Sequence, residues 1–117
     1  MTLSFTGNRQ EFLNLLKLNQ GVMIFKFTAD WCKPCQTIKA EVDAHFEKIT
    51  SNTVQCFEVD VDEAFDLYAF MKTKKMVKGI PTMMAYVKGN HEFYPDDSIS
   101  GAELAGVDAF FQRCSSL

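Results

Sequence analysis

Residues 22–38 read VMIFKFTADWCKPCQTI, and this stretch decides the fold. It opens with a nearly continuous apolar run over 22–27, which has the length of a strand buried on both faces of a sheet. Two cysteines follow, Cys32 and Cys35, and apolar residues then recur at helical spacing over 38–49. The stretch therefore predicts a buried strand that turns into an amphipathic helix at a Cys-x-x-Cys pair.

Strands and helices alternate outward from this stretch. A capping box at Asn8 and Glu11 predicts a helix that ends before Gly21. The other expected elements are a strand over 54–61, a helix capped by Asp62 and carrying Phe65, Leu67, Tyr68 and Met71, a strand over 82–87, a returning hairpin strand over 91–94, and a closing helix with Val107, Phe110 and Phe111. This order predicts an α/β fold with helices on both faces of the sheet.

Length and composition narrow the class of protein. The 117 residues suit a single domain, 1–117, and a hydrophobic share of 47% allows it a core. The net charge of -3 argues against a nucleic-acid-binding protein, and no apolar run is long enough for a membrane helix. Residues 1–5 lack the basic segment and apolar run of a secretory signal, so we expect a cytoplasmic protein.

The Cys-x-x-Cys pair at a helix start is typical of dithiol chemistry. One thiolate attacks a disulfide and a second nearby thiol resolves the mixed disulfide. Unpaired N–H groups and the helix dipole stabilise a thiolate at this place and lower its pKa, and Lys33 adds a cation. Pro34 suits the first helical turn, which needs no N–H group. We expect Cys32 to be the exposed attacking thiol and Cys35 the shielded resolving thiol.

Metal binding and a structural disulfide are the alternative interpretations of the pair. Zinc needs about four ligands, and no second pair of ligands with suitable spacing is present. The isolated His45 and His91 are expected at the surface, so no metal site is expected. Cys56 lies in a predicted strand and is expected to be an inert core thiol. Cys114, near the C-terminus, is expected to be exposed and available for an intermolecular disulfide, although a monomer is favoured.

The segment FTADWCKPC at 27–35 and the segment GIPT at 79–82 together resemble the thioredoxin family. The spacing of the two segments and the order of the elements extend the resemblance over nearly the whole chain. It implies the thioredoxin fold, a central mixed sheet flanked by helices on both faces, with a cis bond before Pro81. It also implies a substrate-docking surface around Cys32, formed by Trp31, Lys33, Pro34, Gly79, Ile80, Pro81 and Gly101.

The resemblance implies a protein-disulfide reductase that contributes to cell redox homeostasis. Its substrates would be proteins that contain disulfides, and no cofactor would be bound. A flavin-containing, NADPH-dependent thioredoxin reductase would act as the external electron donor that recycles the disulfide.

Two departures from the family pattern bear on the chemistry. Lys33 replaces the usual glycine, which favours the reduced dithiol and a more oxidising protein. Lys26 stands where the family has a buried aspartate, and Glu58 stands where it has the partner lysine. We therefore predict a charge-swapped pair in which Glu58 takes the proton that Cys35 loses. The alternative is that the Lys26 ammonium group reaches water while its stem lies in the core.

Two other functions remain open at this point. The chain could be a non-enzymatic interaction module of the same fold, with an incidental dithiol. It could also be a disulfide oxidase or isomerase in an oxidising compartment, which Lys33 favours and the missing signal segment disfavours.

Overall fold

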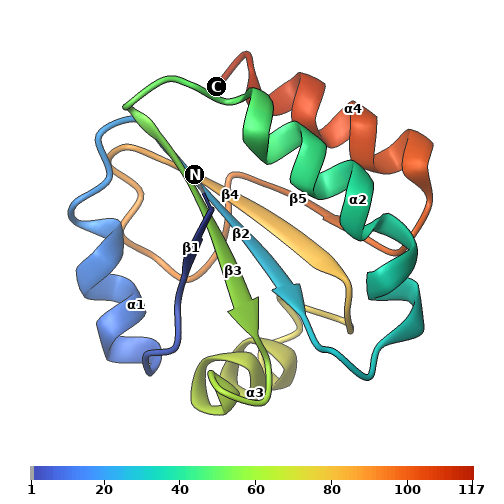
Figure 1. Ribbon diagram of the computed structural model, residues 1–117. Coiled ribbons are helices and arrows are strands. Elements are labelled where there is room, and N and C mark those ends of the chain that lie inside the picture. The colour runs from blue at the N-terminus through green and yellow to red at the C-terminus, as the bar shows by residue number, and fades with distance from the viewer. Residues whose placement is uncertain (1) are drawn as a thin grey trace.

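The computed structural model describes residues 2–117, which form one five-stranded sheet and four helices (Figure 1). The sheet has the strand order β1-β3-β2-β4-β5. Its strands are β1 (Thr2–Ser4), β2 (Val22–Thr28), β3 (Val54–Asp60), β4 (Thr82–Val87) and β5 (Asp97–Ser100). The helices are α1 (Arg9–Leu16), α2 (Lys33–Lys48), α3 (Phe65–Thr73) and α4 (Leu104–Cys114). The expected α/β class with a mixed sheet is confirmed.

The central strand is β2, and all seven of its residues are buried. It pairs with β3 in parallel and with β4 in antiparallel orientation, while β1 adds to β3 in parallel and β5 to β4 in antiparallel orientation. The near-continuous apolar run that predicted β2 thus reflects helices on both faces of the sheet. In this register Lys26 lies directly beside Glu58 of β3 and Met83 of β4.

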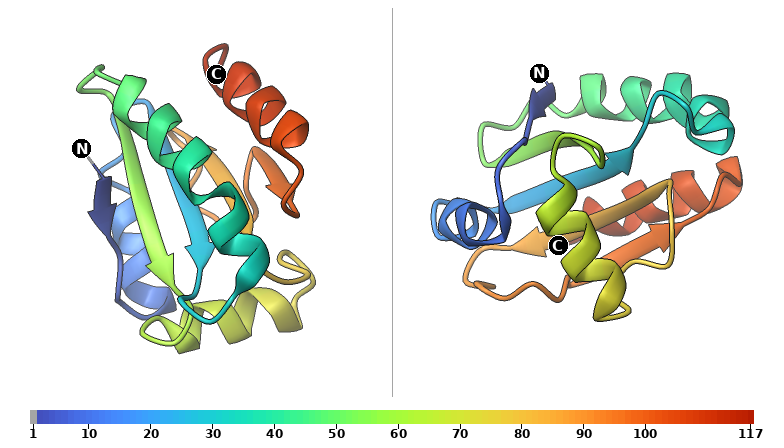
Figure 2. Two further views of the ribbon diagram at one scale, coloured as in Figure 1. Left: turned by 45° about the vertical axis from the view of Figure 1, so that its right-hand side comes forward. Right: turned by 90° about the horizontal axis from the view of Figure 1, so that it is seen from below.

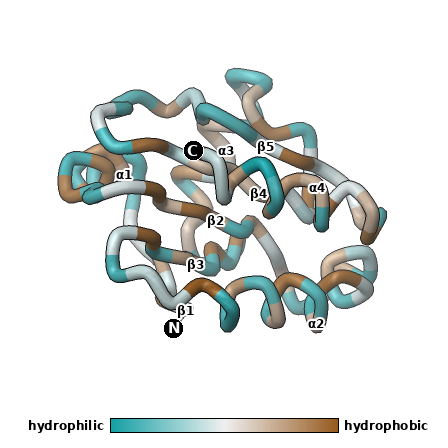
Figure 3. Tube along the Cα trace, turned by 90° about the horizontal axis from the view of Figure 1, so that it is seen from above, coloured by the Kyte–Doolittle hydropathy of each residue, from teal (hydrophilic) through white to brown (hydrophobic). Residues whose placement is uncertain are grey.

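Two helices cover each face of the sheet (Figures 1 and 2). On one face, α1 and α3 pack over a core that is rich in aromatic rings, with Phe12 at 4.8 Å from Phe25 and 5.4 Å from Tyr86 between ring centroids. On the other face, α2 and α4 pack over aliphatic and sulfur-containing residues that include Ile24, Cys56 and Met83. Hydrophobic and hydrophilic residues alternate in short runs along α2, as expected for a helix with one buried face (Figure 3).

The N-terminal helix begins as the sequence predicts. Asn8 Oδ1 accepts the N–H of Glu11 at 2.9 Å, and Glu11 Oε1 accepts the N–H of Asn8 at 2.9 Å. This reciprocal capping box satisfies two of the N–H groups that a helix start leaves unpaired.

The expected cap of α3 is wrong. The helix starts at Phe65 with Ala64 as N-cap and without a side-chain cap. Asp60 instead holds the preceding turn, because its carboxylate accepts the N–H of Asp62 at 2.8 Å and its carbonyl accepts the N–H of Ala64 at 2.8 Å. The carboxylate of Asp62 is directed elsewhere, as described below.

The expected hairpin strand over 91–94 is also wrong, because the returning strand is β5, at Asp97–Ser100. Residues 91–94 form a loop that inserts a side chain into the core instead of pairing with β4. The ring of Phe93 stacks on Phe12 at 6.0 Å, and its carbonyl accepts the hydroxyl of Tyr86 at 2.6 Å. Asp96 then accepts the N–H of Val87 at 2.8 Å, which delays the start of the strand.

Candidate active site: the Cys32–Cys35 pair

The two cysteines lie where the C-terminal end of β2 turns into α2. They form a disulfide with a Cα–Cα distance of 5.2 Å. Cys32 is the N-cap of α2, and Lys33 and Pro34 occupy the exposed first turn. The helix starts here because Cys32 adopts an extended conformation (φ -87°, ψ 106°) and the following proline favours the first turn.

The sulfur of Cys32 occupies the position of a helix-capping group. It accepts the backbone N–H of Cys35 at 3.3 Å. Two donors close the turn before it on the carbonyl of Ala29. They are the backbone N–H of Cys32 and the side-chain amide of Gln36, each at 3.2 Å. A thiolate on Cys32 would therefore lie beside an N–H donor and the positive end of the α2 dipole.

Both sulfurs are more enclosed than the sequence indicates. Cys32 is 5% exposed and Cys35 is 1% exposed. Cys35 is the more buried of the two, as expected, but the expectation that Cys32 is an exposed residue is wrong for this oxidised form. Because the Cys32 sulfur is enclosed, a substrate that reaches it must also come close to the loop that precedes β4.

That loop contains the second segment of the resemblance. The Ile80–Pro81 bond is cis, as expected. The carbonyl oxygen of Ile80 lies 3.8 Å from the sulfur of Cys32. Among residues 2–117, neither the N–H nor the carbonyl of Ile80 has a backbone partner. The loop therefore presents an unpaired peptide group next to the reactive sulfur, preceded by the part-buried Gly79.

Hydrogen bonds fix this loop to the next segment of the chain. The hydroxyl of Thr82 donates to the carbonyl of Gly79 at 2.6 Å and lies 2.9 Å from the hydroxyl of Ser100. Gly101 donates its N–H to the carbonyl of Pro81 at 3.0 Å. Gly101 has a φ of +100°, a conformation that favours glycine. The structure thus brings Gly101 next to the proline loop, as the resemblance implies.

Trp31 forms the exposed aromatic side of the site. Its side chain is 67% exposed, and its indole N–H donates to the carboxylate of Asp62 at 2.8 Å. Asp62 is expected from the sequence to cap α3 instead, and no local pattern reveals a hydrogen bond across 31 residues. Phe65, expected as part of α3, begins the helix three residues after Asp62 and is 68% exposed.

Lys26 and Glu58 are neighbours in the sheet, but they do not form a salt bridge. Lys26 is 1% exposed, and no ion pair within 4.0 Å joins it to an acidic residue among 2–117. Burial lowers the pKa of the Lys26 ammonium group, while the nearby carboxylates of Glu58 and Asp43 oppose this effect. The predicted direct pair is therefore absent, and the lysine is held in a place that disfavours its charge.

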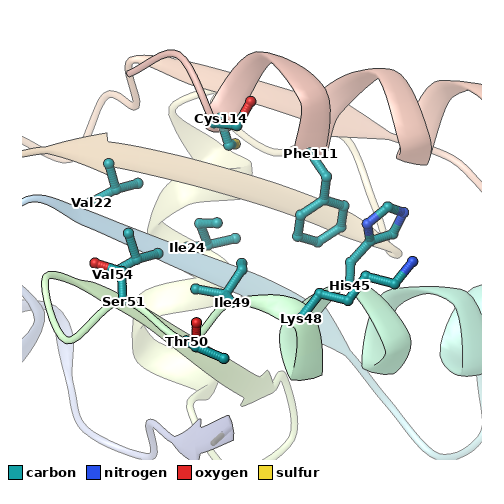
Figure 4. A pocket seen from close by; sticks show the side chains of 11 residues that line it. Val22, Ile24, His45, Lys48, Ile49, Thr50, Ser51, Val54, Phe111 and Cys114 are labelled. Carbon is teal, nitrogen blue, oxygen red and sulfur yellow. The ribbon is translucent and has the colours of Figure 1, made fainter.

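The other two cysteines lie away from the disulfide as free thiols on the α2 and α4 face. Burial raises the pKa of Cys56 to about 11 and that of Cys114 to about 12. Cys56 is a core thiol, as expected. The expectation of an exposed Cys114 is wrong, because α4 turns it inward, where it lines one cavity with Phe111 and Ile24 (Figure 4). Its burial removes the basis for an intermolecular disulfide through this residue.

Cys114 lines an apolar cavity of about 360 Å³ between the C-terminal ends of α2 and α4 (Figure 4). This cavity is not the redox site. It lies beside Lys48 and Ile49, at the opposite end of a 16-residue helix from Cys32, which corresponds to about 24 Å along the helix axis.

A cis-proline loop whose peptide carbonyl lies beside a helix-capping disulfide, on a mixed sheet with two helices on each face, is the arrangement of the thiol–disulfide oxidoreductases of thioredoxin fold. The thioredoxin family model matches residues 4–112. The chain is 33% identical over 100 residues to a thioredoxin of Equus caballus, which covers 86% of this chain and 84% of the relative. The chain belongs to the thioredoxin family.

Further relatives agree with this assignment. A thioredoxin of Coprinus comatus is 29% identical over 107 residues, or 92% of each chain. Among solved structures, Trichomonas vaginalis thioredoxin superposes with a TM-score of 0.74 at 25% identity over 96% of each chain. The family works without a bound cofactor, and its redox-active group here is the Cys32–Cys35 pair. Family and site together give the chain thiol–disulfide oxidoreductase activity, that of a protein-disulfide reductase.

Proposed function

We propose that the chain reduces disulfides in other proteins in two steps, with Cys32 as the attacking residue and Cys35 as the resolving residue. The Cys32 thiolate attacks one sulfur of the substrate disulfide, forms a mixed disulfide and releases one substrate thiolate. The Cys35 thiolate then attacks the Cys32 sulfur, closes the Cys32–Cys35 disulfide and releases the second substrate thiolate. Two electrons pass to the substrate, and the two released thiolates take up two protons.

The observation that carries this assignment is the helix-capping position of the Cys32 sulfur. Its donor from Cys35 stabilises negative charge on Cys32, whereas Cys35 lies deeper, at 1% exposure. The deeper sulfur is suited to attack only a partner that is already bound to Cys32. Geometry and burial thus support the same order of attack.

Docking of the substrate is proposed to occur by strand addition at Ile80. Its unpaired peptide group can pair with an extended substrate segment, while the neighbouring Cys32 sulfur meets the substrate disulfide. Trp31 supplies an exposed apolar surface beside it, and Gly79, Pro81 and Gly101 shape the loop without bulky side chains. Lys33 and Pro34 border the same entrance on the first turn of α2.

Proton transfer from Cys35 is proposed to use Glu58 as the acceptor through a bridging water, with Lys26 stabilising the carboxylate. The support is the register, which places Lys26 beside Glu58, and the part-buried state of Glu58. In this role Glu58→Gln would alter the pH profile of the resolving step and leave the formation of the mixed disulfide unchanged.

Partners, assembly and compartment complete the proposal. The oxidised chain would be recycled by a flavin-containing, NADPH-dependent thioredoxin reductase, and it would act as a monomer in the cytoplasm. Support for a reducing compartment comes from Cys56 and Cys114, which are free thiols in the core. In the described part of the chain, no helix has the length and apolar character needed to cross a membrane.

Insulin reduction driven by dithiothreitol tests the central proposal. We expect Cys32→Ser to abolish the acceleration given by the wild type, and Cys35→Ser to accumulate mixed disulfides through Cys32. Cys114→Ala is the matched control, because it removes a buried thiol at the end of α4, near the C-terminal end of α2 and far from Cys32. Acceleration that survives Cys32→Ser, or trapping through Cys35, would contradict the assigned roles.

A further inference from the structure

A histidine and two carboxylates from different helices converge on the face opposite α1 and α3. Glu41 and His45 lie one turn apart on α2, and Asp108 lies on α4. His45 Nε2 is 2.7 Å from Asp108 Oδ1 and 3.8 Å from Glu41 Oε2. One oxygen of each carboxylate and the imidazole nitrogen all lie within 4.8 Å of one another. His45 is therefore not the isolated surface histidine that the sequence predicts.

The imidazole is held in one orientation by the core below it. Its ring stacks on Phe111 with a centroid distance of 4.3 Å and an interplanar angle of 8° (Figure 4). Phe111 in turn packs edge-on against Phe46 of α2 at 5.6 Å. The side chain of His45 is only 21% exposed. Its Nε2 is thus directed at the two carboxylates by packing rather than by a flexible surface contact.

The two carboxylates lie close together, and Lys48 of α2 attracts both of them from beyond ion-pair distance. Among residues 2–117, no lysine or arginine pairs within 4.0 Å with Glu41 or Asp108, whereas nearby Asp43 pairs with Lys39 at 3.1 Å. Two adjacent carboxylates that share one imidazole form an electrostatic environment that favours a cation.

We propose that Glu41, His45 and Asp108 form a binding site for a divalent transition-metal ion of the zinc type. Imidazole nitrogen and carboxylate oxygen are ligands that Zn²⁺ accepts, at about 2.0–2.2 Å, and the fourth tetrahedral position would be taken by water. Ligand atoms around such an ion lie about 3.3 Å apart. The observed separations of 2.7 and 3.8 Å lie on either side of this value, so small side-chain rotations suffice.

This site is separate from the redox pair. His45 lies ten residues after Cys35 on one continuous helix, about 15 Å along its axis. Its ligands come from α2 and α4, so a bound ion would join the two helices that cover this face. The expected effect is greater stability of the folded chain, because an ion that binds only the native state stabilises it.

Isothermal titration of the oxidised full-length chain with ZnCl2 tests the proposal. In the oxidised protein Cys32 and Cys35 cannot act as thiolate ligands. We expect one equivalent of Zn²⁺ to bind, with an affinity at least about 10-fold weaker in His45→Gln and in Asp108→Asn. His91→Gln is the matched control, because it removes the other histidine, which is exposed.

A Co²⁺ titration supplies a second readout. Binding to nitrogen and oxygen ligands gives cobalt d–d absorption without a thiolate-to-metal charge-transfer band. Three results would overturn the proposal: a Zn²⁺ titration that does not saturate, a zinc affinity of His45→Gln equal to that of the wild type, or a cobalt charge-transfer band from the thiolates of Cys56 or Cys114. Circular dichroism and insulin reduction confirm that each variant is folded. A variant that loses zinc binding but keeps its reductase activity separates this proposal from the proposed function.

Discussion

The buried lysine on β2 leads to a prediction that runs against the usual effect of core substitutions. Lys26 is 1% exposed and lies between Glu58 and Met83, without a salt bridge. Burial lowers its pKa, so the folded state disfavours its charge more than the attraction of Glu58 favours it. Lys26→Met keeps an unbranched side chain of similar length and removes the charge. We expect this substitution to stabilise the protein at pH 7.

The expected gain is about 1–3 kcal/mol in the free energy of unfolding. Each pH unit by which the native pKa of Lys26 lies below that of the unfolded chain costs the charged native state about 1.4 kcal/mol. This penalty already includes the attraction to the part-buried Glu58, because burial and that attraction act on the same native pKa. Replacement of buried charges by apolar side chains gives stabilisation of this order in other proteins.

The pH dependence has a definite sign. Well below the lowered native pKa, both states hold the Lys26 proton and the full penalty is present. Between that pKa and about 10.5, the unfolded chain binds more protons than the native chain, so wild-type stability rises with pH relative to the variant. The advantage of Lys26→Met should therefore shrink as the pH approaches 10.5.

Urea unfolding of the oxidised proteins at pH 7 and pH 10, followed by circular dichroism, measures this difference. Lys17→Met, at an exposed lysine at the end of α1, is the matched control and should change stability by less than about 0.5 kcal/mol at either pH. A Lys26→Met protein that is less stable than wild type at pH 7, or a difference that does not vary with pH, would refute the reasoning.

Three further expectations follow from the geometry. Cys56 and Cys114 should resist iodoacetamide at pH 8 until the chain is unfolded, because a thiol of pKa about 11 is only about 0.1% thiolate there; labelling of the native protein, read by mass spectrometry, would contradict their burial. Asp62→Ala removes the acceptor of the indole N–H and should loosen Trp31, lowering its fluorescence anisotropy and lowering kcat/KM for insulin about 2- to 10-fold, and unchanged anisotropy would show that this bond does not hold the indole. Phe12→Ala should cost about 3–5 kcal/mol in urea unfolding, since the ring is fully buried among other aromatic residues, and a cost below about 1 kcal/mol would show that its core collapses around the gap.

Local patterns predicted the parts of the molecule that local physics decides. The apolar run of β2, the cysteine pair at the start of α2 and the capping box at Asn8 each depend on residues close in sequence, and all three are confirmed. The strand predicted over 91–94 is wrong because an aromatic residue such as Phe93 is compatible both with a paired strand and with a loop that packs into the core. The stacking of Phe93 on Phe12, which is distant in sequence, favours the loop.

The contacts that the sequence could not reveal depend on how distant elements are oriented. Cys114 is buried because α4 presents that side to the sheet, and a terminal position in the sequence gives no sign of this. Asp62 has its partner 31 residues away, and His45 meets Asp108 across 63 residues. The cis bond before Pro81 was predicted from the family resemblance. The absence of a Lys26–Glu58 salt bridge among the described residues depends on the positions of both side chains, which the sequence does not contain.

The attachment of Gly101 to Pro81, and of Ile80 to the region of Cys32, has a consequence for how activity is lost. The catalytic surface is a junction of three chain segments, with 48 residues between Cys32 and Ile80 and 18 between Thr82 and Ser100, so no short fragment around one segment contains it. A peptide that carries only the cysteine pair would keep the sulfur chemistry but lose the strand-binding edge. Catalytic rate should therefore decline in step with cooperative denaturation, which makes enzyme turnover a sensitive measure of the native population in crude samples.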